Sequence, residues 1–204
     1  MHTLVVVANP DPRSLTHAVA RELAAALPPG SVEVADLAEE GFDPRFTLAD
    51  RRAYSADGSL PPDVLREHRR LDRATDLVLV FPVYWWSVPA LLKGWIDRVF
   101  VNGWAFDHDP GQGLRPRLGA LTTHLVPVAG DDAGAYDRHG YERSLRTQLE
   151  HGVVDYCGSR RGATVFIHES ERDDAAARAE EVARAVRTVR DAVLHDREPA
   201  APAR

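Results

Sequence analysis

The sequence predicts an α/β fold in which one doubly wound parallel sheet carries helices on both faces. Short apolar runs of the kind that form buried parallel strands recur along the chain, and each leads into a segment that favours a helix. Strand and helix alternate in this way about five times, with no repeats and no obvious linker. We therefore expect one domain over residues 1–197 and a disordered tail over 198–204.

The first half of the chain predicts three strands and two helices. β-Branched and apolar residues mark the strands, the helices contain good helix formers, and Pro28 ends the first of them. A stretch rich in Gly, Pro and Asp predicts a surface excursion before the second helix. In chain order, the expected elements are strand 4–8, helix 18–27, strand 32–37, excursion 41–62, helix 63–74 and strand 77–81.

The second half predicts two strands and three helices. Pro89 falls in the first turn of the next helix, where its missing amide costs nothing. The last helix is charged, but its valines recur at helical spacing, so one face of it packs against the protein. In chain order, the expected elements are helix 88–101, strand 120–128, helix 141–156, strand 164–168 and helix 172–194.

Charge and cysteine content narrow the class of protein. The formal net charge of −6 is mild and argues against nucleic acid as a partner. The single cysteine, Cys157, rules out a disulfide framework, fits a reducing compartment and is expected to be a small buried side chain. The apolar runs are too short to span a membrane, and no signal-peptide core precedes the first strand. We therefore expect a cytoplasmic protein with no membrane insertion.

The segment 81–100 is the most informative part of the chain. An apolar run stops at Pro82, which lacks the amide that a central strand needs. Tyr84, Trp85 and Trp86 follow, and we expect them to form a rigid aromatic loop at the carboxyl end of the third strand. Open α/β sheets bind ligands at that position, and a flat ring system would find a stacking surface there. The alternative is that these rings are core, although three consecutive aromatics cannot all point one way.

This segment resembles the NAD(P)H:quinone oxidoreductases of flavodoxin-like fold, which include mammalian-type quinone reductases, the bacterial drug-activity modulator and potassium-efflux ancillary reductases. The resemblance rests on Phe-Pro, the aromatics, Val-Pro-Ala and Leu-Lys-Gly-Trp, and it extends from Thr3 to about Gly158. It implies a flavodoxin-like sheet of strand order 2-1-3-4-5 and a homodimer whose second subunit completes the active site. It also implies that the loop containing Pro82, Val83 and the three aromatics holds the isoalloxazine ring of a flavin.

The loop after the first strand combines groups that favour phosphate. Amides at a helix N-terminus attract phosphate, Ser14 and Thr16 add hydroxyls, and Arg13 adds charge. A plain N-cap at Ser14 is the alternative. The resemblance implies that flavin phosphates bind here, at Asn9, Arg13, Ser14, Leu15 and Thr16. Asn9 stands where the family usually has His, and Thr16 where it often has Asn, so the cofactor is FAD, which the motif match favours, or FMN.

A glycine-containing loop follows the fourth predicted strand and is expected at the same edge of the sheet. The resemblance implies that the amides of Ala129 and Gly130 bond the flavin pyrimidine edge. It also implies that Tyr136 and His139 offset negative charge on the reduced flavin, a task that suits a hydroxyl donor near a titratable imidazole. Tyr141 competes for the tyrosine role, and an ordinary surface tyrosine and histidine are the alternative.

The segment between these two loops contains two further aromatic residues. The resemblance implies that Trp104 and Phe106 line the substrate pocket near a dimer contact. The neighbouring residues 107–109 read Asp-His-Asp and favour a polar turn over a metal site, because adjacent loop residues rarely converge on one ion. No metal is expected. Because no dinucleotide fingerprint is present, a nicotinamide donor would have to share the flavin cavity.

The resemblance implies an enzyme, an NAD(P)H dehydrogenase (quinone). It would transfer two electrons from NADPH or NADH through flavin N5 to a small quinone-like acceptor, by a ping-pong mechanism. Two alternatives are an azo- or nitro-compound reductase on the same scaffold and a flavin-binding regulatory subunit of a membrane transporter. An electron carrier is a third alternative, less favoured because carriers are usually far more acidic than a net charge of −6.

Overall fold

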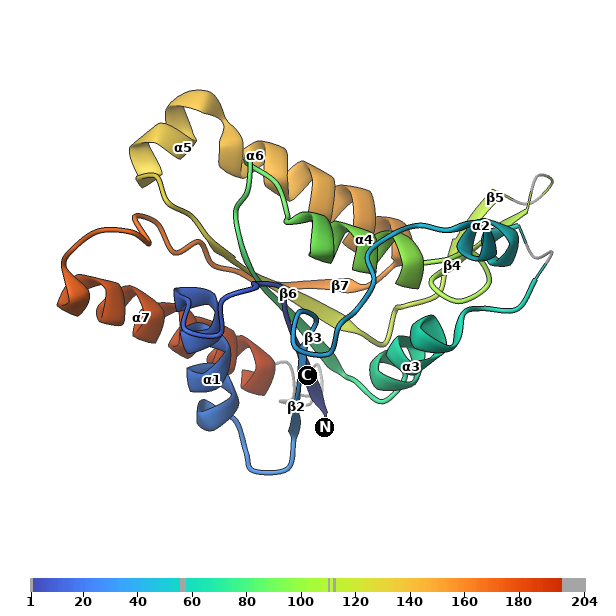
Figure 1. Ribbon diagram of the computed structural model, residues 1–204, viewed down its shortest axis with the longest axis horizontal. Coiled ribbons are helices and arrows are strands. Elements are labelled where there is room, and N and C mark those ends of the chain that lie inside the picture. Colours follow the sequence, from blue (N-terminus) through green and yellow to red (C-terminus); the bar gives the residue numbers. More distant parts are fainter. Residues whose placement is uncertain (1, 56–57, 110, 112, 196–204) are drawn as a thin grey trace, which may run out of the picture.

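The computed structural model of the protein describes residues 2–55, 58–109, 111 and 113–195 (Figure 1). Its centre is a five-stranded parallel sheet in which the strands lie in the order β2-β1-β3-β6-β7. Counted among the strands of this sheet alone, that order is 2-1-3-4-5, so the predicted doubly wound fold is confirmed. The bounds are β1 Thr3–Val7, β2 Val32–Asp36, β3 Asp76–Pro82, β6 Thr122–Val128 and β7 Arg160–Thr164. The tail predicted at 198–204 lies outside the described residues.

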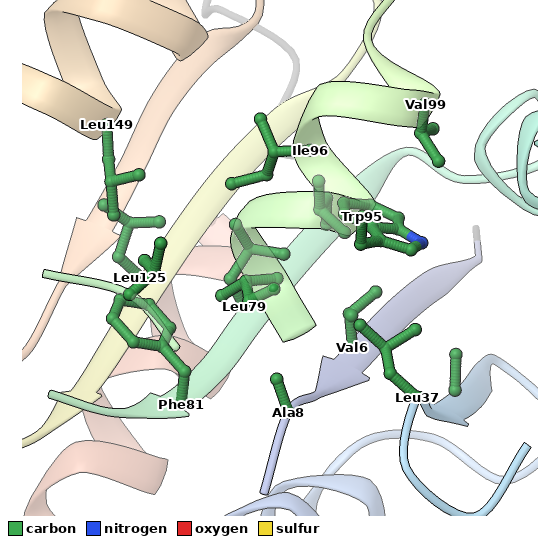
Figure 2. Packing of buried hydrophobic residues seen from close by; sticks show 14 of the residues in the cluster. Val6, Ala8, Leu37, Leu79, Phe81, Trp95, Ile96, Val99, Leu125 and Leu149 are labelled. Atoms are coloured by element: carbon green, nitrogen blue, oxygen red, sulfur yellow. The ribbon is translucent and has the colours of Figure 1, made fainter. Parts of the chain in front are cut away.

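Helices cover both faces of the sheet, as predicted (Figure 1). On one face, α1 (Leu15–Ala26) and α7 (Ala175–His195) pack their apolar side chains on β1, β3 and β6. On the other face lie α3 (Pro62–Leu71), α4 (Ala90–Val99), α6 (Tyr141–Arg146) and the π-helical segment η1 (Thr147–Asp155). Figure 2 shows Trp95 and Ile96 of α4 lying over Val6, Leu79 and Leu125 of the sheet.

Three features of the fold differ from the sequence-based expectation. The last strand occupies Arg160–Thr164 instead of 164–168, because it is an edge strand whose exposed arginines give no apolar signal. The excursion contains a short helix, α2 (Leu48–Tyr54), which begins with a capping box between Thr47 and Asp50. A hairpin of β4 (Phe106–Asp109) and β5 (Gly113–Pro116) stands where a polar turn was predicted at 107–109, and that prediction is wrong.

The excursion is held to α4 by one buried arginine. Arg98 donates from Nε to Asp50 at 2.9 Å and from Nη1 to Asp63 at 2.6 Å and to the Asp43 carbonyl at 2.7 Å. Gly94, one turn earlier on α4, lets the backbone of Pro44 approach the helix closely. These contacts fix the excursion against the sheet face that α4 covers.

Candidate active site

The carboxyl ends of β1, β3 and β6 meet at one edge of the sheet. These three strands are neighbours and run parallel, so the loops that follow them leave from the same edge. Open α/β sheets bind ligands there. The loops contain most of the residues predicted for the site, and each loop is described in turn below.

The β1–α1 loop is a compact cluster of polar groups. Asn9 is buried and donates from Nδ2 to Thr16 Oγ1 at 3.1 Å, while its own side-chain oxygen accepts from the Asp11 amide at 2.9 Å. Ser14 caps α1 by accepting from the His17 amide at 3.4 Å, so the predicted N-cap role is real. The amides of Leu15 and Thr16, at the start of the helix, have no carbonyl within it to bond. This loop therefore offers amides and hydroxyls to an anion.

Arg13 is the cation of this loop, and it points into solvent. Its side chain is exposed and pairs with Asp11 at 3.4 Å. The backbone amide of Arg13 and its guanidinium hold the pKa of Asp11 below its usual range. Arg13 thus places a positive charge at the surface of this loop.

Sequence reasoning missed two residues behind Ser14. The Ser14 hydroxyl lies 3.0 Å from His17 Nδ1, and His17 Nε2 lies 2.7 Å from a carboxylate oxygen of Asp36. His17 is buried on α1, and Asp36 is the last residue of β2. The available signal was the spacing of three residues between Ser14 and His17, which puts both on one face of a helical turn.

The aromatic loop after β3 is a tight two-residue turn. Tyr84 and Ser87 exchange backbone hydrogen bonds of 3.0 and 3.1 Å, so Trp85 and Trp86 occupy the two corner positions. Both tryptophans have positive φ, 49° and 56°, a conformation that is rare and strained for bulky residues. Backbone strain of this kind clusters at ligand sites. Pro82 and Val83 join the turn to the sheet, since the Val83 amide donates to the Val128 carbonyl at 2.8 Å.

The three aromatic side chains of this turn have different roles. Trp86 stacks on Tyr141 of α6 with ring centroids 4.3 Å apart and planes 25° apart. Tyr84 is 48% exposed and Trp85 is 87% exposed, so these two rings face solvent at the edge of the sheet. An indole this exposed, on a strained turn, offers a stacking surface to a planar ligand.

The β6–α5 loop contains the two backbone amides, of Ala129 and Gly130, that were predicted to donate to a ligand. The Ala129 amide donates to the Ile167 carbonyl at 2.7 Å, so it belongs to the sheet edge and is not free for a ligand. Gly130, the next residue, is exposed. Of the two amides predicted to bond the flavin pyrimidine edge, only that of Gly130 remains a candidate.

Tyr136 and His139 lie in α5 (Ala133–His139) but are not in contact as a pair. Tyr136 is buried, and burial together with the charge of Asp131 raises the pKa of its hydroxyl to about 12. The imidazole beside it belongs to His168, with ring centroids 4.9 Å apart, and the Nδ1 atom of His168 is buried without a hydrogen-bond partner among the described residues. His139 is exposed and stacks on Tyr141 at 5.1 Å instead.

The sequence did not point to His168, because His168 follows the edge strand, far along the chain from Tyr136.

A hollow of about 650 Å³ includes Tyr136 in its wall. Its other walls, from α5, α6 and η1, are mainly charged, so it does not resemble a site for a planar apolar ring.

Trp104 and Phe106 do not join the site within one copy of the chain. Trp104 stacks on His68 with centroids 3.9 Å apart and donates from its indole nitrogen to Asp72 at 3.0 Å. Phe106 packs against Tyr54 and Tyr156 under the β4–β5 hairpin. In the chain, Trp104 and Phe106 follow the carboxyl end of α4, whereas the aromatic turn precedes its amino end. One copy of the chain does not bring these two residues to the aromatic turn, so their role in a substrate pocket near a dimer contact stays a prediction.

Within the described ranges, no group of three His, Cys, Asp or Glu side chains could hold a metal ion. No helix in the same part of the chain is long and apolar enough to cross a membrane. Cys157 is buried, and burial raises the pKa of its thiol to about 11, so this cysteine is an inert packing residue.

Comparison with known proteins identifies the family. A family model described as "Flavodoxin-like fold" matches residues 1–190. A rat protein named ribosyldihydronicotinamide dehydrogenase [quinone] is 34% identical over 151 residues, which are 63% of this chain and 63% of the relative. A Haemophilus influenzae protein named uncharacterized NAD(P)H oxidoreductase is 30% identical over 162 residues, 78% of this chain and 79% of the relative.

Among solved structures, an NAD(P)H:quinone oxidoreductase from Methanothermobacter marburgensis has the same fold, with a TM-score of 0.84 at 24% identity. The match covers 94% of this chain and 98% of the other. The strand order and the named relatives agree with the resemblance found in residues 81–100. The chain belongs to the flavodoxin-like fold family, its relatives are named as a dehydrogenase [quinone] and an NAD(P)H oxidoreductase, and its predicted class of enzyme is confirmed.

Proposed function

We propose that the protein is a flavin-dependent NAD(P)H oxidoreductase that passes two electrons to a quinone-like acceptor. One observation carries the proposal. The start of α1, where Ser14 caps the helix, and the exposed, strained Trp85 turn lie at the same edge of the sheet, after the neighbouring strands β1 and β3. A flavin nucleotide has a phosphate end and a planar ring, and these two features match them. The printed names of the relatives support the same class of reaction.

The residues present fit a flavin nucleotide. The amides of Leu15 and Thr16, the Ser14 hydroxyl and the exposed Arg13 would hold the phosphate end. Tyr84 and Trp85 would flank the ring, and the exposed amide of Gly130 would bond its polar edge. We favour FAD over FMN. A bound flavin supplies the two-electron redox chemistry.

The chain's own residues would hold the aromatic turn in place and supply a proton donor. Trp86 and Tyr141, stacked on each other, brace the turn that presents Trp85. Tyr136 keeps its hydroxyl proton at all working pH values, because its pKa is raised to about 12, and can donate to developing negative charge. NAD(P)H and the acceptor would use the same exposed space in turn, which gives a ping-pong mechanism.

The proposal extends to the assembly and its location. We propose a homodimer, in which a second copy covers apolar side chains that the excursion exposes, such as Phe46 and Leu48. In that dimer Trp104 and Phe106 could contribute to the partner's site. We propose that the protein is one flavin-binding domain over residues 1–197 and that it works in the cytoplasm.

Steady-state kinetics test the function directly. Protein loaded with FAD should oxidise NADPH or NADH only when a simple naphthoquinone is present as acceptor. Double-reciprocal plots at several quinone concentrations should give parallel lines, the pattern of a ping-pong mechanism. Protein freed of flavin is the control and should be inactive. Intersecting lines would reject the ping-pong mechanism, and absence of turnover with flavin bound would reject the reductase.

The stacking role belongs to Trp85 in particular. Trp85→Ala should raise the flavin Kd about three- to tenfold, the loss expected for one aromatic contact. It should leave the unfolding midpoint unchanged, because the indole is 87% exposed. Fluorescence titration measures the Kd, with Leu194→Ala as the control for loss of an exposed apolar side chain elsewhere. Equal flavin affinity in the two variants would contradict the stacking role.

Tyr136 and His139 should behave differently when replaced. Tyr136→Phe removes the buried hydroxyl and should slow flavin reduction at least about tenfold while flavin stays bound. His139→Ala should stay within about twofold of the parent, because the exposed His139 ring packs on Tyr141 and not on Tyr136. Stopped-flow reduction by NADPH measures both rates. Between pH 6 and 9 the parent rate should show no ionisation of this tyrosine, since its pKa lies near 12.

A further inference from the structure

Three side chains behind the phosphate-binding loop form a continuous hydrogen-bonded chain. Ser14 Oγ lies 3.0 Å from His17 Nδ1, and His17 Nε2 lies 2.7 Å from Asp36 Oδ2. The other carboxylate oxygen of Asp36 accepts from the amides of Ala38 and Glu39, at 3.1 and 3.2 Å, so the carboxylate is held in place. The chain therefore connects the end of β2 to the first turn of α1.

The state of the His17 ring decides what the Ser14 hydroxyl can do. Ionised Asp36 only accepts hydrogen bonds, so the facing Nε2 atom of His17 must carry a hydrogen. In the neutral ring Nδ1 is then an acceptor, and the Ser14 hydroxyl must donate its single hydrogen to it. The Ser14 oxygen already accepts from the His17 amide. In this state Ser14 has no hydrogen left to offer a ligand.

Protonation of the ring reverses the bond between these two side chains. Nδ1 then carries a hydrogen and donates to the Ser14 oxygen, which leaves the hydroxyl hydrogen free to turn outward. That hydrogen would add to the amides of Leu15 and Thr16 at the N-terminus of α1. Protonation thus supplies one more donor and one more positive charge next to a bound phosphate.

Charged groups near the ring come from the end of β2 and from the β1–α1 loop. Asp36, from the end of β2, is in direct contact with the ring. In the β1–α1 loop, the pKa of Asp11 is lowered mainly by its bonds to Arg13 and to a smaller extent by the charge of His17. Arg13, the cation of that loop, is exposed and paired with Asp11. On the far side of α1, α7 packs through apolar side chains.

We propose that His17 is a positioning residue that couples binding of the flavin phosphates to uptake of a proton. The protonated ring turns the Ser14 hydroxyl toward the phosphate, and Asp36 holds the ring in place in both states. This inference rests on the proposed function, because it requires a flavin nucleotide as the ligand. It predicts that phosphate-containing flavins bind more tightly as the pH falls through the range in which imidazole titrates.

The test measures flavin affinity against pH and needs no turnover. FAD is the probe, because its diphosphate keeps its charge between pH 5.5 and 8.5, whereas a phosphate monoester itself titrates near pH 6. Riboflavin, which has no phosphate, is the matched ligand control. For the parent protein, the FAD Kd should rise about tenfold from pH 5.5 to pH 8.5, the loss of one hydrogen bond to a charged group. The riboflavin Kd should stay constant.

Two variants separate His17 from other histidines. His17→Gln cannot gain a proton, so its FAD Kd should be independent of pH and close to the parent value at pH 8.5. His2→Gln removes another histidine paired with a carboxylate, Glu33, at the opposite end of β1, and should keep the parent's pH dependence. Calorimetry of the unmodified protein in two buffers of different ionisation enthalpy gives the proton uptake directly, with no substitution that could disturb folding.

The outcomes distinguish failure of the His17 proposal from failure of the proposed flavin-dependent function. Tighter FAD binding at low pH, with proton uptake and with loss of both in His17→Gln, supports the inference. FAD binding that does not vary with pH, or a pH dependence that riboflavin or His17→Gln shares, overturns it and leaves the proposed function intact. Protein that takes up no flavin at any pH overturns both.

Discussion

Arg98→Leu should lower the free energy of unfolding by about 3–5 kcal/mol, the cost of leaving a buried charge without its partner. Asp50 has a side chain only 1% exposed and receives the Arg98 Nε hydrogen at 2.9 Å. Asp63 and the Asp43 carbonyl lose their donor in the same substitution. Because these three acceptors anchor the excursion to α4, the variant should also loosen the segment that leads into α3.

Urea denaturation followed by circular dichroism measures this loss. Arg45→Leu is the matched control, because Arg45 also pairs with a carboxylate, that of Asp43, but both partners are on the surface. Its effect should stay within about 0.5 kcal/mol. Equal destabilisation by the two substitutions would contradict the anchoring role of Arg98.

The Arg98 pair also predicts how stability depends on pH. The pKa of Asp63 is lowered: burial raises it, but the hydrogen bond and charge of Arg98 outweigh that effect. A carboxyl with a lowered pKa in the folded state contributes stability that is present above its unfolded pKa, near 4. The contribution of Asp63 is lost as the pH falls from this unfolded pKa through the lower pKa that Asp63 has in the folded protein. In Arg98→Leu that part of the acid sensitivity should be absent.

Gly94→Ala should destabilise the protein by about 2–3 kcal/mol, although alanine is the better helix former by about 1 kcal/mol. A Cβ atom at this position would lie 2.1 Å from the Pro44 carbonyl oxygen and 2.5 Å from Pro44 Cβ. The backbone of the excursion would have to move away from α4.

The control for this substitution is a helical glycine with space around it. At Gly152 of η1 an added Cβ would lie 3.4 Å from the Thr147 carbonyl oxygen, an ordinary contact. Gly152→Ala should therefore be neutral or stabilising when both variants are compared with the parent by thermal unfolding. If Gly94→Ala is as stable as Gly152→Ala, close packing of the excursion on α4 is not what requires the glycine.

Local patterns were sufficient to predict the central strands, whereas the strand order was implied by the resemblance to the family. The buried strands β1, β3 and β6 are continuous apolar runs, and such runs are recognisable without knowledge of their neighbours. The edge strand β7 was displaced in the prediction because Arg160 and Arg161 are held by partners elsewhere in the fold, such as Thr122 and Asp155. An edge strand needs no apolar alternation on its exposed side, so its sequence gives a weak signal.

The site was predictable as a set of loops but not as a set of contacts. Residues 81–100 and the β1–α1 loop do meet at one edge, as parallel strands require. Whether Trp85 or Trp86 faces the ligand depends on Tyr141, which is 55 positions away from Trp86 and stacks on it. The partners of Ser14 and Tyr136, namely His17 with Asp36 and His168, likewise depend on tertiary packing.

An anaerobic titration of the flavin-loaded protein with NADPH tests the central claim most directly. The visible absorption of the bound flavin should bleach to the two-electron reduced form with one equivalent of NADPH, and a naphthoquinone added afterwards should restore it. A flavin that binds but stays oxidised would contradict the reductase and favour a regulatory flavoprotein. Failure to take up FAD or FMN would show that the Ser14 loop and the Trp85 turn do not form a flavin site.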